Sequence, residues 1–268
     1  MVKRISTSRP IANLPREIKG GFTLVELLAV LAIAAILAVL TTPAIQSLLK
    51  AGTFTKSVYA MADSLNLART YAMANNTYVY VGLTEVDNTK PIQTNPQVAG
   101  TGRVALAIVA TKDGTNDSTL LTTNYGTGTF LTQVRQVQAF DFVHIVYTAN
   151  APLTTTVGTG NMVRPTNITT ALLTQMKMPA TAVPTTPFSI PLGSSLGSGK
   201  YNFYNNTSTQ ILCFNPQGGV LLSGAAVLWL EIDLQPMRGT VKPTTANEPN
   251  RAALLIDGVT GSITVYRP

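Results

Sequence analysis

The most constraining feature of the sequence is an apolar run close to its start. From Phe22 to Leu40 there are nineteen residues with one hydroxyl, on Thr23, and one charge, on Glu26. A helix needs about 20 predominantly apolar residues to span a bilayer, so this run is long enough to do so. The sequence therefore predicts one membrane-spanning helix, with residues 1–21 on one side and the rest of the chain on the other.

The charge ahead of the run predicts its orientation. Residues 1–21 contribute +4 of the formal net charge of +7, so the remaining chain carries +3. Basic residues before a span place that end in the cytoplasm. A charge of +3 without a basic cluster does not indicate nucleic-acid binding, and no nucleic-acid partner is expected. The charged residues of this segment are Lys3, Arg4, Arg9, Arg16, Glu17 and Lys19.

A secretory signal peptide is the alternative interpretation of residues 1–45. Its apolar core usually has about 7 to 15 residues, and a small-residue cleavage site follows. Here the apolar run is longer and contains Glu26, and Thr41–Ala44 is a poor match to such a cleavage site. These differences favour a retained membrane helix.

The junction between the basic segment and the apolar run combines several features. It has the sequence Lys19-Gly20-Gly21-Phe22-Thr23-Leu24-Val25-Glu26, and Pro43 follows twenty-one residues after Phe22. This combination resembles the processing site and hydrophobic helix of the type IV pilin and type II secretion pseudopilin superfamily.

The resemblance implies a role for each of these residues. A prepilin peptidase would cut between Gly21 and Phe22, the new amine of Phe22 would be methylated, and Pro43 would bend the helix. Glu26 would pair with an N-terminal amine of its own or a neighbouring subunit during assembly. A carboxylate inside a membrane costs about 2.5 to 3.5 kcal/mol on insertion scales, which independently indicates a functional residue.

The same resemblance implies partners and a location. The partners are the prepilin peptidase, other pilin or pseudopilin subunits, the inner-membrane assembly platform and membrane lipid. The chain would cross the bacterial inner membrane once, with its N-terminus in the cytoplasm and its globular domain in the periplasm. It would then enter a pseudopilus or pilus.

The helical pattern continues beyond Pro43 and becomes amphipathic. Apolar residues recur at spacings of 4, 3, 4, 3 and 4, which is the stripe of a helix lying on a core. We expect one helix from Phe22 to about Ala74, ended by Asn75-Asn76. The stripe consists of Phe54, Val58, Met61, Leu65, Ala68 and Ala72.

After Asn76 the apolar pattern changes to a period of two, which is typical of strands. Leu131–Gln138 fits either a strand or a helix, Thr84–Gly102 is expected to be a loop, and Thr169–Met178 looks helical. The last two strands are expected to form a hairpin through Asp257–Gly261. The predicted strands are Thr77–Leu83, Arg103–Ala110, Phe140–Tyr147, Gln210–Phe214, Val220–Leu222, Ala225–Leu234, Ala252–Ile256 and Ser262–Tyr266.

This order predicts an α+β fold of the pilin-like kind, with a long N-terminal helix packed on an antiparallel sheet. The expected divisions are a cleaved leader (1–21), a transmembrane and assembly helix (22–42), its amphipathic continuation (43–76) and a β-rich globular domain (77–268). Within that domain, residues 149–200 are rich in Pro, Thr, Gly and Ser, and predict a loop-rich insertion.

Two short segments support a narrower resemblance. Asn66–Ala72 near the helix end, followed by a strand and later by Phe214–Gly218, is similar to the H class of minor pseudopilins and to related minor type IV pilins. The long Thr-rich middle segment departs from a compact member of that class.

A search for catalytic residues favours a protein that is not an enzyme. The segment Gly193–Gly197 matches the G-x-S-x-G pattern around a nucleophilic serine, here Ser195. That pattern needs a preceding strand and a histidine later in the chain. Pro191 precedes it, and the single histidine, His144, lies upstream. A Ser/Gly loop is therefore the preferred interpretation.

No metal or cofactor is expected. With one histidine, His144, and one cysteine, Cys213, a zinc site with nitrogen and sulfur ligands is implausible. His144 is expected to be a hydrogen-bonded core or edge residue, and Cys213 a small buried apolar one. Calcium stays open through the loop oxygens of Asp113, Asn116 and Asp117, although a solvated loop is preferred.

The predicted function is therefore that of a minor pilin or pseudopilin, a structural subunit that supports protein secretion or pilus assembly. The alternative is a filament-tip adhesin or substrate-binding module. Only 12% of the residues are charged, and the region after Thr84 is rich in Thr and Asn, which favours hydrogen bonding over ionic contacts. A membrane-tethered enzyme is the least favoured reading.

Overall fold

The computed structural model describes residues 23–95, 97–98, 100–117, 130–146, 154–155, 162–176, 187–190, 201–204, 211–237 and 250–268. The side chains of residues 40–51, 155, 187–190, 201–202 and 204 are outside that description. The chain divides into two compact units, Met1–Ser47 and Leu48–Pro268.

One helix, α1 (Leu24–Asn75), begins in the first unit. The large apolar side chains from Leu24 to Val39 are between 56% and 78% exposed. The helix continues through Pro43 without an end. Among the residues that the structure describes, no helix is long and apolar enough to cross a membrane.

The part of α1 in the second unit buries one face. All six residues of the predicted stripe, from Phe54 to Ala72, are fully buried, which confirms the amphipathic pattern. The helix ends where the sequence predicts. Asn76 has a φ of 47°, and the Thr77 amide donates to the Ala72 carbonyl at 3.1 Å. Asparagine tolerates this left-handed conformation, which is common just after a helix.

Six strands form a sheet with the order β12-β11-β10-β1-β2-β3, in which all neighbours are antiparallel. We call it sheet A. The pairing of β2 with β3 is irregular on both sides of Ile108. Its strands are β1 (Val79–Asp87), β2 (Gly102–Thr111), β3 (Leu131–Asp141), β10 (Leu212–Phe214), β11 (Val220–Leu222) and β12 (Ala225–Ala226).

Sheet B has the order β15-β14-β13-β4, with β7 paired in parallel to β13. Two small pairs lie apart from it, β5 with β6 and β8 with β9. The strands of sheet B are β4 (Val143–Ile145), β7 (Leu173–Gln175), β13 (Trp229–Pro236), β14 (Ala252–Asp257) and β15 (Ile263–Tyr266). The remaining elements are β5 (Thr154–Thr155), β6 (Met162–Val163), η1 (Thr170–Leu172), β8 (Pro187–Ile190) and β9 (Tyr201–Tyr204).

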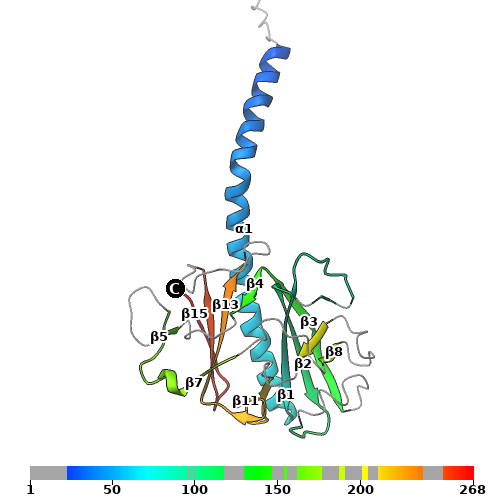
Figure 1. The fold of residues 1–268 in the computed structure, drawn as a ribbon, viewed down its shortest axis with the longest axis vertical. Coiled ribbons are helices and arrows are strands. Elements are labelled where there is room, and N and C mark those ends of the chain that lie inside the picture. Colours follow the sequence, from blue (N-terminus) through cyan, green and yellow to red (C-terminus); the bar gives the residue numbers. More distant parts are fainter. Residues whose placement is uncertain are drawn as a thin grey trace, which may run out of the picture. The chain divides into compact units, whose positions relative to one another are not determined.

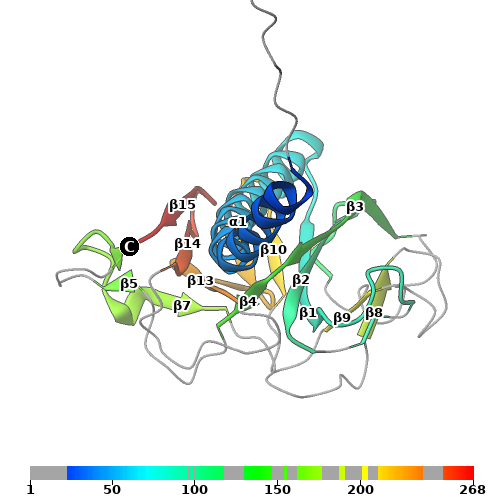
Figure 2. The same ribbon diagram turned by 90° about the horizontal axis from the view of Figure 1, so that it is seen from above.

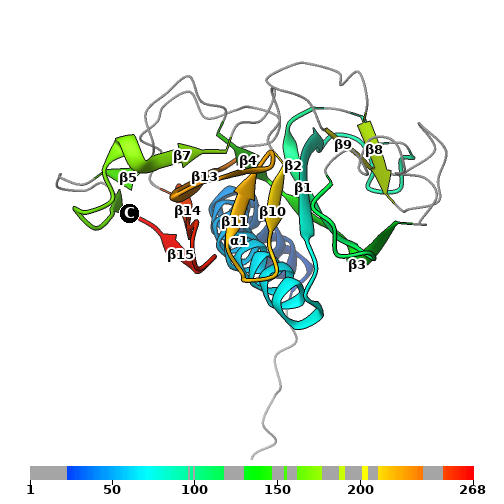
Figure 3. The same ribbon diagram turned by 90° about the horizontal axis from the view of Figure 1, so that it is seen from below.

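The core of the second unit lies between α1 and both sheets. Figures 1 and 2 show the cyan part of α1 with β1 to β3 on one side and β13 to β15 on the other. Figure 3 shows β10 and β11 against the same helix from below. Apolar residues of the helix and of both sheets form one cluster, and Phe203 of β9 joins a second cluster on the other face of sheet A. The α+β fold class is confirmed.

Phe142 connects the two sheets at a sharp bend. Its φ is 62°, an unusual value for a bulky side chain. Its amide donates to the Gly102 carbonyl at 2.7 Å, and its carbonyl accepts from the Met237 amide at 2.8 Å. The single predicted strand Phe140–Tyr147 is therefore divided. Phe140 and Asp141 belong to β3, and the strand resumes as β4 in sheet B.

Three other sequence predictions need correction. Of the predicted helix Thr169–Met178, the described residues 169–176 form no α-helix, because only one 3₁₀ turn forms before β7 pairs with β13. Strand β1 extends to Asp87, into the segment predicted as a loop, because its whole length pairs with β2. Ala225–Leu234 forms two strands, β12 and β13, in different sheets. The ambiguous segment Leu131–Gln138 is part of β3, and the C-terminal hairpin forms as predicted.

Candidate functional site

The first turn of α1 is closed by a reciprocal pair of side chains. The Glu26 amide donates to the Thr23 hydroxyl at 3.2 Å, while the Thr23 amide and hydroxyl donate to Glu26 Oε2 at 3.4 and 3.3 Å. This is a capping box, which satisfies two amides that a helix start leaves without partners. Both residues are exposed. The Thr-x-x-Glu spacing that signals such a box is present in the sequence, so Glu26 has a capping role beside the predicted assembly role.

The predicted cleavage site lies just ahead of this turn. Gly21 and Phe22 are outside the described residues, as is the side chain of Pro43, so the cleaved bond, the methylated amine and the bend stay predictions. Glu26 follows Phe22 by four positions, which is about one helical turn.

The same stretch is the part of the chain that matches known proteins. Residues 18–42 match a family model described as the prokaryotic N-terminal methylation motif. The chain carries a prepilin-type methylation motif. The motif is that of the type IV pilin and pseudopilin superfamily, and it indicates a structural subunit processed by prepilin peptidase and assembled with other pilin subunits. Comparisons with curated proteins and with solved structures gave no match.

The motif covers every predicted processing and assembly residue except Pro43. It includes Gly21, Phe22 and Glu26, and it ends at Thr42. It also implies a membrane-anchored precursor that later enters a pilus. The second unit lies wholly beyond the matched residues, so the motif does not indicate a role for that unit.

His144 has a structural environment. Its Nδ1 lies 2.9 Å from both carboxylate oxygens of Glu85, and Glu85 Oε1 also accepts from the Gly102 amide at 2.8 Å. Both side chains are about nine-tenths buried. The pair joins β1 of sheet A to β4 of sheet B, as expected for a hydrogen-bonded core histidine.

Cys213 is buried, as predicted. Burial raises the pKa of its thiol to about 12. Because the thiolate is the nucleophilic form, this cysteine is unreactive at neutral pH. Ser195 is outside the described residues.

The oxygens considered for calcium are used in other contacts. Asp113 Oδ1 accepts from the Thr115 amide at 3.1 Å and from its hydroxyl at 2.8 Å, and these bonds lower the pKa of Asp113. Asn116 Oδ1 accepts from the Tyr80 hydroxyl at 3.2 Å. Among the described residues, no group of three or more His, Cys, Asp or Glu side chains could hold a metal ion.

The two segments of the narrower resemblance meet in space. A Cβ on Gly218 would lie 2.8 Å from Met73 Sδ and 3.4 Å from Arg69 Nε. Arg69 Nε also donates to the Thr260 carbonyl at 2.7 Å. The end of α1 therefore packs against the loop after β10 and the loop of the C-terminal hairpin. The two segments are therefore neighbours in space for a packing reason. Their contact does not show that the chain belongs to the H class.

A buried polar cluster on sheet B was missed by sequence reasoning. Glu231 and Arg164 are both at least 98% buried. Glu231 accepts from the amide of Thr154 at 3.1 Å and from its hydroxyl, while Arg164 donates to the Thr154 carbonyl and hydroxyl. Two described parts of the predicted insertion, 154–155 and 162–176, are thus tied to β13. The available signal was the alternation of Glu231 and Asp233 with apolar residues in one strand.

Proposed function

We propose that the chain is a minor pilin or pseudopilin, cut between Gly21 and Phe22, methylated at Phe22, and packed by its N-terminal helix into a type IV pilus or a type II secretion pseudopilus. The precursor is anchored once in the inner membrane, with its C-terminal unit in the periplasm. The inner-membrane assembly platform then extracts it. The subunit performs no chemistry of its own.

One observation carries this proposal. The methylation motif ends in a helix that carries large apolar side chains on every side from Leu24 to Val39, and each of these is more than half exposed. A helix that is apolar all round is stable only when it is buried in lipid or protein. Lipid before assembly and neighbouring helices after assembly provide both environments.

Processing is tested by producing the full chain with and without an active prepilin peptidase. N-terminal sequencing and intact mass should show a product that begins at Phe22 only when the peptidase is active. An established pilin precursor in the same cells serves as the control for peptidase activity. If that control is cut while this chain keeps residues 1–21, the proposal is wrong.

Assembly is tested separately with Glu26→Ala. The variant should be cut and inserted normally, but its amount in sheared filaments should fall strongly, because its carboxylate can no longer pair with an N-terminal amine. Asp63→Ala removes an exposed carboxylate from the same helix within the second unit and is the matched control. Normal incorporation of Glu26→Ala would reject the role given to Glu26.

A further inference from the structure

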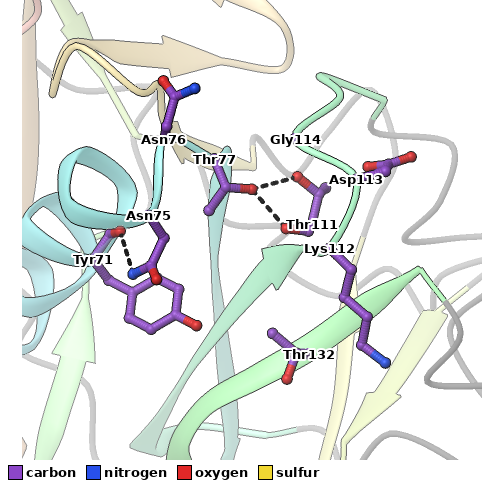
Figure 4. A pocket seen from close by; sticks show the side chains of 9 residues that line it. All are labelled: Tyr71, Asn75, Asn76, Thr77, Thr111, Lys112, Asp113, Gly114 and Thr132. Carbon is purple, nitrogen blue, oxygen red and sulfur yellow. Dashed lines mark hydrogen bonds between the residues drawn. The ribbon is translucent and has the colours of Figure 1, made fainter.

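A polar cavity of about 380 Å³ lies where α1 ends in the second unit. Figure 4 shows it between the last turn of α1, the turn after β2 and the start of β3. Its volume is within the roughly 300 to 1,000 Å³ of ordinary ligand pockets. The residues around it come from three separate parts of the chain and are Tyr71, Asn75, Asn76, Thr77, Thr111, Lys112, Asp113, Gly114 and Thr132.

The floor of this cavity is fixed by hydrogen bonds. Thr77 and Thr111 are both at least 95% buried. The Thr77 hydroxyl donates to the Thr111 carbonyl at 2.6 Å and lies 2.9 Å from the Thr111 hydroxyl, which holds the helix end against β2. At the rim, the bonds from Thr115 hold the Asp113 carboxylate in its turn. A ligand would therefore meet walls that are already in position.

The charges around the cavity disfavour ionic ligands. The carbonyls at the C-terminal end of α1 and the Asp113 carboxylate repel anions. The positive charge of Lys112, another lining residue, disfavours cations. The two side chains contribute opposite charges, so the balance favours a neutral ligand.

The remaining groups suit a ligand with many hydroxyls. The amide nitrogen of Asn75 donates to the Tyr71 carbonyl at 3.0 Å, which leaves its amide oxygen as an acceptor. Asn76 adds an exposed amide with donors and an acceptor, and Thr132 adds a hydroxyl. Tyr71 supplies an aromatic ring at the wall, against which a partly apolar ring can lie. Polar and apolar groups both line the cavity, which suits a hydroxylated ring better than a lipid or a purely aromatic molecule.

We propose that this cavity binds a neutral sugar ring, as a monosaccharide or as one unit of a glycan. The proposal does not depend on how the chain is processed or assembled, because every residue of the cavity belongs to the second unit. A subunit with this property would give a filament a point of attachment to a glycan-coated surface.

The test uses the purified full chain in a zwitterionic detergent without a sugar headgroup. Saturation-transfer NMR and calorimetry are run with glucose, galactose, mannose, N-acetylglucosamine and N-acetylgalactosamine, and with calcium chloride and inorganic phosphate as ionic probes. At least one sugar should bind saturably, while neither ionic probe should compete with it.

Variants locate the binding. Thr132→Arg fills the cavity and should weaken sugar affinity by about tenfold or more. Asn75→Ala removes an acceptor and should weaken it by about fivefold. The exposed Asn66 on the same helix lies outside the cavity, so Asn66→Ala should leave affinity unchanged. Asn75 is exposed, so Asn75→Ala provides the second variant if Thr132→Arg does not fold.

Three outcomes would overturn the proposal. The first is the absence of saturable binding by any of the five sugars. The second is sugar binding that folded Thr132→Arg or Asn75→Ala leaves intact, and the third is binding of the ionic probes alone. Cleavage at Gly21 and filament incorporation should be normal in all of these variants, so a failed sugar test and a failed assembly test are distinguishable.

Discussion

Two parts of one helix use apolar residues in opposite ways. From Leu24 to Val39 the large apolar side chains are more than half exposed, whereas the stripe from Phe54 to Ala72 is fully buried. The first part has apolar residues on every side. The second has them at spacings of three and four, with the exposed Lys56 and Asp63 between.

The two parts of the helix contribute to different properties, the buried stripe to stability and the exposed run to assembly. The buried stripe contributes to the free energy of folding of the second unit, because its side chains lose contact with water when the sheets pack on them. The exposed run gains nothing of that kind within its own unit and can contribute only when lipid or another subunit covers it. Substitutions in the two parts should therefore affect different measurements.

The largest expected effect comes from shortening a stripe residue. Leu65→Ala should lower the free energy of unfolding by about 2 to 5 kcal/mol, since it leaves a cavity under both sheets. The matched change Leu31→Ala, in the exposed run, should alter that value by less than about 0.5 kcal/mol. Urea unfolding of the full chain in detergent, followed by the fluorescence of the single tryptophan, Trp229, gives both numbers. Equal losses would show that the comparison is wrong.

The next effect tests the contact between the end of α1 and its loops. Gly218 and Gly224 have φ values of 85° and 82°, so an alanine at either position should cost about 1 to 2 kcal/mol through backbone strain. Only at Gly218 would the new methyl group also meet Met73, while Gly224 has nothing within 4 Å. Gly218→Ala should thus lose about 1 kcal/mol more, because the flexible thioether must shift. Equal losses at the two positions would show that the contact between Gly218 and Met73 does not affect stability.

Much of this helix could be predicted from the sequence because its signals are local. The stripe, the stop at Asn75-Asn76 and the alternation of the later strands each lie within a few residues of one another. The predicted elements that proved wrong are those whose structure depends on pairing with residues far away in the sequence. Thr169–Met178 has a helix-like pattern, yet Leu173–Gln175 within it pairs with β13 as a strand. Phe142 bends the predicted strand Phe140–Tyr147 so that its residues enter two sheets.

The side-chain contacts were less predictable than the elements. Glu85 and His144 are 59 residues apart, and Thr154 and Glu231 are 77 apart, so no local spacing announces either pair. The polar cavity likewise combines a helix end, a turn and a strand. The capping box of Thr23 and Glu26 is the exception, since its three-residue spacing was readable.

A smaller effect should appear at the start of α1. Thr23→Ala removes the capping box and should cost the first turn about 0.5 to 2 kcal/mol. Hydrogen exchange at the amides of residues 24–27 should become faster, while urea unfolding of the second unit should not change. Thr70→Ala, at an exposed position of α1, is the control and should leave exchange at residues 24–27 unaffected. Unchanged exchange in Thr23→Ala would mean that the box does not stabilise the helix start.

The smallest expected effect concerns the pH dependence of stability. It compares the exposed apolar run of α1 with a short buried apolar run, Ile211–Phe214. Burial raises the pKa of Cys213 from 9.0 to about 12, so above pH 9 the unfolded thiol loses its proton while the folded thiol keeps it. The folded state then binds more protons than the unfolded state, and the free energy of unfolding falls as the pH rises. Between pH 8 and pH 9.5 this thiol should account for a loss of roughly 1 kcal/mol or less. Cys213→Ala should show a correspondingly shallower decline. Tyr80 and Tyr266, whose pKa values burial also raises, contribute to the decline that is left. Identical declines in both proteins, or rapid modification of native Cys213 by a maleimide at pH 7, would show that this run is accessible to water like the first.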